Sequence, residues 1–321
     1  MIEITHEILE QAVEREKADQ KKLAKRTNRF LVSLFVICVL EFIPMLLILR
    51  ADQLRGLAWS ALIIILDIVY LFIGTTIISG SHFGNTSIFR VLRSFSDTKF
   101  YKELNCSDTK RKIILLEERL KKSKGEVWII SAGSLMGYYV EMNMPEKADE
   151  LYRQAKSFKP SNDAQAACKI NLELGYFDFK DDNDSYLRSF EDNSELLIRN
   201  EWNNPRVIYK IGFLAAYSSY YTIKKDYAKA IEIYDFYREL LNMAAETDKS
   251  IEKMRDSSNK TCSISYAKLF CHLGDKEKAA AYFKDAMAKY DDSVSPSTKR
   301  FYAETKQLLD EAGVDYSEQE I

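Results

Sequence analysis

Two acidic residues lie within long apolar stretches of the sequence, where an acid is costly and therefore informative. Glu41 falls in residues 30–49 and Asp67 in residues 57–78, and each stretch has about the 20 apolar residues that cross a bilayer core. The two acids are about equally far from the short loop between the stretches, which predicts a similar depth in the membrane. Such a pair can share a proton in a mutual hydrogen bond or dock onto a polar group of another membrane helix. Two tolerated acids facing a neighbouring helix, or a path for protons, are the alternatives.

The other residues that could do chemistry are scattered along the chain. The histidines show no HExxH or comparable spacing, the five cysteines include no CxxC pair, and no P-loop is present. No nucleophile stands beside a visible base. We therefore predict that the protein is not an enzyme and that it holds no cofactor and no metal. An active site that forms only in an assembly is an alternative.

The composition is typical of a helical protein without a strong overall charge. The 321 residues include 11 glycines and 5 prolines, together about 5% of the chain, where average usage is about 12%. The formal net charge is only -2, so no overall field attracts nucleic acid. The odd number of cysteines favours reduced thiols in a cytosolic setting over a disulfide framework. The predicted fold class is all-α.

The apolar stretches predict a two-helix transmembrane hairpin over residues 30–79. Basic residues are concentrated before the first stretch and after the second, whereas the loop between them holds only two. By the positive-inside tendency, both termini are expected in the cytoplasm, with two spans in the plasma membrane of a bacterium. The flanking basic residues are Lys21, Lys22, Lys25, Arg26 and Arg29 before the hairpin, Arg90, Arg93, Lys99 and Lys102 after it, and Arg50 and Arg55 in the loop.

Short helices are expected on both sides of the hairpin. Residues 1–29 predict a weak amphipathic helix with a basic end, which lies at the membrane surface, pairs with another helix, or continues solvated into the first span. Residues 80–124 predict an interfacial helix and then a connecting helix with Ser107 as its N-cap. The apolar faces consist of Ile4, Ile8, Leu9 and Val13 before the membrane, and of Ile113, Leu116 and Leu120 in the connecting helix.

Residues 125–321 contain a short phrase that is written more than once. The segment "PEKADELYRQAKSFKP" at residues 145–160 returns in altered form as "LGDKEKAAAYFKDAMAKY" at residues 273–290. In both copies a small residue, an aromatic residue and a second small residue follow at gaps of about four and three positions, which puts them on one face of a helix.

This phrase resembles the tetratricopeptide repeat, a pair of antiparallel helices of about 34 residues. The resemblance implies an α-solenoid of about four degenerate helix pairs, ended by a cap helix at residues 297–313. Small residues then let two helices approach closely, while aromatic residues fill the space between pairs. Helix-pair repeats of another kind are the alternative. The four copies are residues 129–162, 167–200, 211–244 and 260–293. The small positions are Ala148, Ala230 and Ala279, and the aromatic ones are Tyr152, Tyr234 and Phe283.

Members of this family usually bind extended peptides or partner helices along a concave groove lined by the first helix of each pair. The matching positions here nominate Val140, Glu141, Asn171, Asp178, Ser219, Thr222, Lys268 and His272 as groove residues. Some members hold a Lys and an Asn that clamp the terminal carboxylate of a peptide. The matching positions in this chain hold Gly133, Gly137, Ala215 and Ser219, so a carboxylate ligand of that kind is not expected.

Together these features predict a membrane-anchored adaptor or scaffold whose repeats bind a protein or peptide partner. Through the hairpin, a membrane-protein partner or a second copy of the chain is a further expected contact, beside the bilayer itself. One alternative is an accessory subunit of a membrane transport or secretion complex, in which Glu41 and Asp67 provide the docking. Another is an enzyme whose active site is completed only in an assembly.

Overall fold

The computed structural model describes residues 4–51, 63, 70, 100, 103–104, 108–246, 249–290 and 294–316, with only the backbone described over 38–51. The chain divides into two compact units. The first, here called the repeat unit, consists of Met1–Glu16 and Asp108–Ile321, and the second consists of Lys17–Ser107. Every regular element in the described part of the chain is helical, so the fold is all-α.

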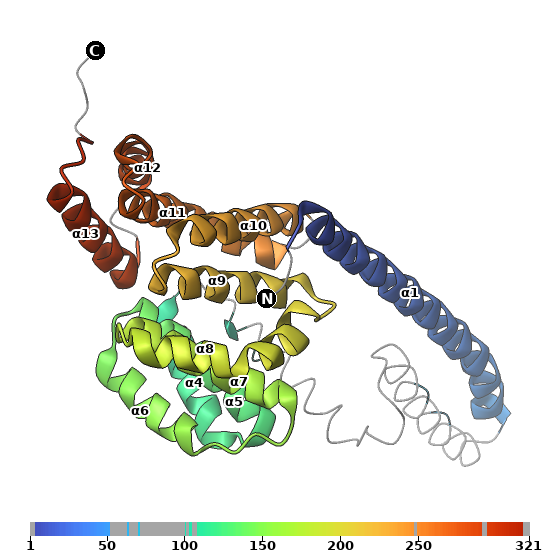
Figure 1. Ribbon diagram of the computed structural model, residues 1–321. Helices are drawn as coiled ribbons and strands as arrows, with labels where there is room; N and C mark the ends of the chain where they lie inside the picture. The colour runs from blue at the N-terminus through green and yellow to red at the C-terminus, as the bar shows by residue number, and fades with distance from the viewer. Residues whose placement is uncertain are drawn as a thin grey trace. The chain divides into compact units, whose positions relative to one another are not determined.

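The repeat unit is a succession of helix pairs (Figure 1). The succession of pairs begins after α4 (Thr109–Lys122), and its four pairs are α5 with α6, α7 with α8, α9 with α10 and α11 with α12. The paired helices are α5 (Gly125–Glu141), α6 (Pro145–Ser157), α7 (Asp163–Phe179), α8 (Asn183–Leu197), α9 (Val207–Ile223), α10 (Tyr227–Ala245), α11 (Lys249–His272) and α12 (Lys276–Lys289). A π-helix, η2 (Ile198–Trp202), follows α8, and α13 (Pro296–Glu311) ends the described chain. Each predicted copy covers one pair, although α11 begins well before residue 260.

One kind of turn joins the two helices of every pair. In each turn one residue has a positive φ, and the next N–H donates to a carbonyl five residues back, the Schellman arrangement that ends a helix. In the last three pairs an aspartate then caps the second helix through its side chain. The repeated phrase therefore encodes a helix stop followed by a helix start. The positive-φ residues are Asn143, Asp181, Lys225 and Gly274, and the capping aspartates are Asp182, Asp226 and Asp275.

The small and aromatic positions of the phrase occupy the contacts that the sequence predicts for them. Each small position is fully buried, and each aromatic ring contacts a ring of the following element. Tyr152 stacks on Tyr176 of α7 with the ring centroids 4.0 Å apart. Tyr234 meets Tyr266 of α11 at 5.1 Å, and Phe283 meets Tyr302 of α13 at 5.0 Å. Aromatic pairs of this kind stabilise a fold beyond the free energy gained from buried area. These ring contacts therefore help to hold each helix pair against the next.

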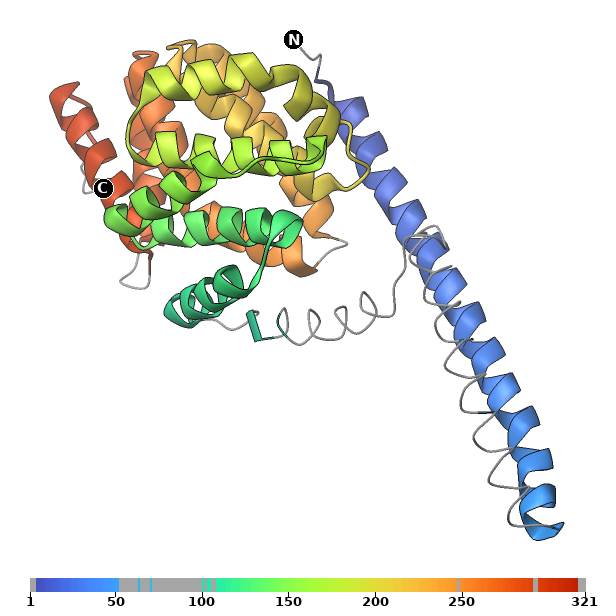
Figure 2. The same cartoon turned by 90° about the horizontal axis from the view of Figure 1, so that it is seen from below.

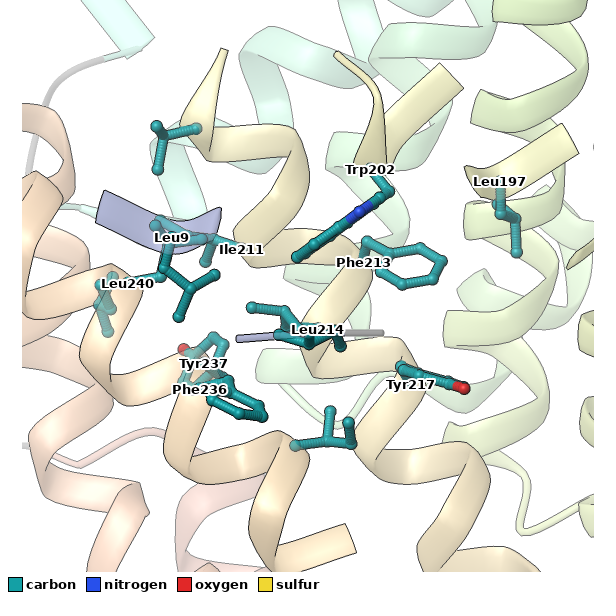
Figure 3. Packing of buried hydrophobic residues seen from close by; sticks show 14 of the residues in the cluster. Leu9, Leu197, Trp202, Ile211, Phe213, Leu214, Tyr217, Phe236, Tyr237 and Leu240 are labelled. Carbon is teal, nitrogen blue, oxygen red and sulfur yellow. The ribbon is translucent and has the colours of Figure 1, made fainter. Parts of the chain in front are cut away.

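The beginning of α1 (His6–Ala51) belongs to the core of the repeat unit. Leu9 and Val13 are buried in the same cluster as residues of α9 and α10, and Figure 3 shows Leu9 beside Ile211 and Leu240. The carboxylate of Glu16 accepts a hydrogen bond from the N–H of Val207 at 2.8 Å. Of the amphipathic face expected before the membrane, Ile4, Leu9 and Val13 are thus covered by protein, whereas Ile8 is exposed. The sequence did not identify this covering surface.

The last helix, α13, closes the array. It contacts α11 beside it and also α5 of the first pair, and Figure 2 shows it along one side of the paired helices. Only two of its side chains are fully buried, Thr305 and Leu309. The cap helix at residues 297–313 was expected only to cover the end of the last pair. In the structure this helix also contacts the first pair.

The connecting helix α4 begins one residue later than predicted. Its N-cap is Asp108, whose carboxylate accepts a hydrogen bond from the N–H of Lys110 at 2.9 Å. The predicted N-cap, Ser107, lies outside the described residues. Ile113 and Leu116 are buried, as expected for a face that packs on the repeats.

In the second unit, the described residues of α1 contact Tyr70. The ring of Tyr70 stacks on Phe30 with a centroid distance of 5.4 Å, and its hydroxyl is 2.6 Å from Ser33 Oγ. Val32, Phe35 and Val36 are exposed. No helix in the described part of the chain is both long enough and apolar enough to cross a membrane. Most of the second apolar stretch, residues 57–78, and most of residues 80–107 lie outside the described residues.

Candidate binding pocket

A pocket of about 480 Å³ lies in the repeat unit where three first helices of pairs reach their ends. Asp178, Thr222 and His272 lie in the last turns of α7, α9 and α11, and all three line the pocket. The walls are completed by residues of α10 and by Phe301 of α13. Because first helices run in the same direction in successive pairs, the same turn of each helix is brought to one place.

Five of the eight nominated groove residues meet in this pocket. They come from three helices that are far apart in the sequence, and the repeat frame explains why they converge. The five are Asp178, Ser219, Thr222, Lys268 and His272.

The other three nominated residues lie elsewhere. Val140 and Glu141 are half-buried at the end of α5, where burial raises the pKa of Glu141 against the opposing charge of Lys112. Asn171 lies on α7 and donates a hydrogen bond to the carboxylate of Glu201 in η2. The groove expected along all four first helices is therefore concentrated at the last three pairs. The side chain of Glu41 and the whole of Asp67 lie outside the described residues.

Several hydroxyl groups of the pocket are already used within the fold. Thr222 Oγ1 donates to the carbonyl of Ser218 at 2.9 Å, and Ser218 Oγ donates to the carbonyl of Ala230 at 3.0 Å. The Tyr237 hydroxyl is 2.9 Å from Ser258 Oγ. The Ser218 bond joins α9 to α10 and the Tyr237 bond joins α10 to α11, whereas the Thr222 bond lies within α9. With these hydroxyls engaged, recognition is left mainly to the charged and aromatic groups of the pocket.

Charged side chains of both signs line the pocket. Asp178 and Asp181 come from the end of α7 and its turn, and Lys268 comes from α11. Although the side chain of Asp178 opens onto the pocket, the surrounding walls desolvate it and raise its pKa, against the charges of Lys268 and Arg300. Burial, together with Lys268 and Lys225, lowers the pKa of His272, so this imidazole is neutral near pH 7.

Aromatic rings form much of the remaining wall, and sequence reasoning did not assign them to the site. Tyr227 stacks on His272 with ring centroids 4.5 Å apart, and Tyr234 stacks on Tyr237 at 5.4 Å. The position of Tyr227 directly after the turn at Asp226 was a usable signal, because that turn adjoins the last turn of α9. Phe301 carried no such signal, since its place depends on how α13 closes the array.

A second unusual group lies outside the pocket, in η2. Glu201 is buried, and burial raises its pKa to about 7, with the hydrogen bond from Asn171 acting against the shift. Nearby, the buried ammonium of Lys210 donates to the carbonyl of Trp202. π-Helices are rare and often accompany functional positions, but Glu201 faces packed protein and not the pocket described above.

Among the residues that the structure describes, no cluster of His, Cys, Asp and Glu could hold a metal ion. Comparisons with protein-family models, with characterised proteins and with solved structures find no match for this chain. The pocket therefore has to be interpreted from its own chemistry.

Proposed function

We propose that this chain is a membrane-anchored adaptor whose helix pairs bind a protein partner in the pocket at the ends of α7, α9 and α11. The observation that carries the proposal is the meeting of five nominated groove residues in one open pocket. A wall of aromatic rings and a few charges suits an extended polypeptide, which offers both backbone and side chains for recognition.

We further propose that the helix pairs are tetratricopeptide-like. The recurring turn, the buried small residues and the ring contacts between successive pairs support this proposal. Each of them is a feature by which a helix pair buries an apolar face that it cannot bury alone.

The anchor is proposed to be the two-helix hairpin of residues 30–79, with both termini in the cytoplasm. Two observations support it beside the length of the apolar stretches. Val32, Phe35 and Val36 form an exposed apolar face on α1, and Tyr70 contacts Phe30 and Ser33 as a second antiparallel helix would. An exposed face of this kind needs an apolar environment. Protease added to sealed spheroplasts should leave the repeat unit intact, and its digestion would contradict the proposed orientation.

Site-specific crosslinking in cells tests the adaptor directly. A photoreactive residue at Ala215, an exposed position that lines the pocket, should yield a discrete crosslinked protein that mass spectrometry identifies. The matched control places the same residue at Ala281, an exposed position of α12 outside the pocket, and should not yield that product. The same product from both positions, or none from Ala215, would contradict the proposal.

A membrane transport or secretion subunit is the second candidate, favoured by the two acids within the apolar stretches. The double variant Glu41→Gln, Asp67→Asn separates the candidates. An adaptor keeps the Ala215 crosslink in this background, whereas a subunit that docks through its membrane helices loses its partner.

A further inference from the structure

We infer that the pocket receives a basic side chain, lysine or arginine, of the partner polypeptide, and that the carboxylate of Asp178 is its ion-pair acceptor. This inference rests on the proposed function and specifies the chemistry of the partner at the same pocket. It starts from the observation that the pocket contains a carboxylate whose side chain has no hydrogen-bond or ion-pair partner among the described residues.

The backbone carbonyl of Asp178 accepts a hydrogen bond from the N–H of Asp181, but its side chain makes no hydrogen bond or ion pair with any residue that the structure describes. The two cations whose charges lower the pKa of Asp178, Lys268 and Arg300, each lie over an aromatic ring. Lys268 Nζ lies 5.3 Å from the ring centroid of Phe301. The guanidinium of Arg300 lies 5.4 Å from the ring of Phe179 and 3.3 Å from the carboxylate of Glu304. The side chain of Asp178 is therefore exposed in an open pocket, where its oxygens are available to a ligand.

The helix ends around Asp178 add to this preference. The last turns of α7, α9 and α11 face the pocket, and the C-terminal end of a helix carries a partial negative charge. A cation is favoured near such an end, and an anion is disfavoured. The partial negative charges of these three helix ends favour a cation in the pocket, as Asp178 and Asp181 do.

The basic groups of the pocket do not reverse this preference. His272 is neutral near pH 7, because burial and two lysines lower its pKa. Lys225 is exposed in the turn after α9, where solvent screens it, and Lys268 lies over Phe301. An anionic group entering the pocket would meet Asp178 at close range, whereas a cation would relieve the desolvation of that carboxylate.

The aromatic walls suit the rest of a basic side chain. Lysine and arginine bury an aliphatic stem along apolar surface, and their charged ends are attracted to ring faces. Tyr227, Tyr234 and Phe301 provide such surfaces in the pocket. A volume of about 480 Å³ has room for more than one side chain, so neighbouring residues of the partner can enter beside the basic one.

Peptide display against the full-length chain in detergent tests the inference. A random dodecapeptide library should yield peptides with Lys or Arg at one shared position. Their affinity should fall at least tenfold on Asp178→Asn, and it should not change on Asp192→Asn, the matched control at an exposed aspartate of α8. A charge-reversal pair gives a second measurement: Asp178→Lys should bind the same peptides once their basic residue is changed to Glu.

A pocket-filling variant separates failure of this inference from failure of the adaptor proposal. Peptides that lose binding on Ala215→Trp, and keep it on Ala281→Trp, bind in the pocket. If such peptides lack a basic residue or ignore both Asp178 substitutions, the inference is wrong and the adaptor stands. If no peptide is selected, or if none responds to Ala215→Trp, both are overturned.

Discussion

Helix α1 has apolar residues at helical spacing in two stretches, and the two differ in how far their side chains are buried. In the first, Leu9 has no exposed surface and lies in the core cluster of the repeat unit. In the second, Phe35 is 70% exposed and Val32 is 64% exposed. One stretch is covered by its own chain, whereas in the other the described side chains of Val32, Phe35 and Val36 are exposed.

This difference shows what an amphipathic pattern can and cannot predict. The pattern states that a helix face avoids water, but it does not state which surface covers the face. At Leu9 the cover is a set of residues roughly 200 positions away in the sequence, on α9 and α10. At Phe35 the proposed cover is the bilayer. Each of the following measurements tests one side of this contrast.

The largest effect is expected for Leu9→Ala. Removing a fully buried leucine side chain leaves a cavity, so unfolding of the repeat unit should become easier by about 3 to 4 kcal/mol. Urea unfolding of the full-length chain in detergent, followed by tryptophan fluorescence, measures this change. Ile8→Ala is the control on the same helix, because Ile8 is 37% exposed and should cost less than about 1 kcal/mol. Equal effects of the two substitutions would mean that the first stretch is not docked as described.

The next effect comes from Glu201, in the element beside the docked stretch. Its pKa of about 7 in the folded chain exceeds the ordinary value of 4.5, so the folded state holds the proton more tightly than the unfolded state. The contribution to stability is present at low pH and is lost as pH rises through 7. It amounts to about 2 kcal/mol between about pH 5.5 and about pH 8.5.

Unfolding measured across that pH range checks the sign and the size. Glu201→Gln should remove this part of the pH dependence, whereas Glu195→Gln, at an exposed position of α8, should leave it in place. An unchanged pH profile in Glu201→Gln would rule out the assignment.

A smaller effect is expected for Glu16→Ala. The Glu16 carboxylate accepts the Val207 N–H at the start of α9, where the N-cap residue Arg206 makes no side-chain hydrogen bond. Loss of such a cap should lower the free energy of unfolding by about 1 kcal/mol and should increase hydrogen exchange at the start of α9. Glu10→Ala, on the exposed side of the same helix, is the control. If hydrogen exchange at Val207 does not change, the hydrogen bond between Glu16 and Val207 does not contribute to stability.

The smallest effect on the repeat unit is expected for Phe35→Ser. An exposed side chain contributes little to folding, so unfolding of the repeat unit should change by less than about 0.5 kcal/mol. Extraction of the chain from membranes by carbonate should nevertheless become easier, because the substitution removes apolar area from the proposed lipid contact. A large loss of stability instead would show that a protein surface covers this stretch as well.

The parts of the fold that depend on nearby residues could be predicted from the sequence. The turn before Asp275 and the ring contact of Phe283 follow from a phrase of fewer than 20 residues, because helix stops, caps and small positions act over one or two turns. The convergence of Asp178, Thr222 and His272 was predictable for the same reason, since Asp178 and Thr222 occupy the same place in their copies and His272 occupies the next one.

The parts that depend on distant contacts could not be predicted. Asn171 was placed in the groove by its position in the frame, yet it bonds Glu201 in a π-helix that has no sequence signature of its own. Phe301 became a wall of the pocket only because α13 contacts other helices. In both cases the position of a residue in its copy determines which way it faces within its own helix pair. The irregular connections between pairs determine which residues it contacts.

The contact of α13 with both α11 and α5 changes the order in which this protein can become functional. An open array behaves as a line of neighbours, which can form pair by pair during synthesis and fray from either end. A last helix that reaches the first pair turns the line into a ring, whose final link is made only after the ribosome has released the C-terminal segment. Because Phe301 of that helix lines the pocket, a chain that ends before α13 lacks part of the pocket wall and, under the proposed function, should bind the partner less well.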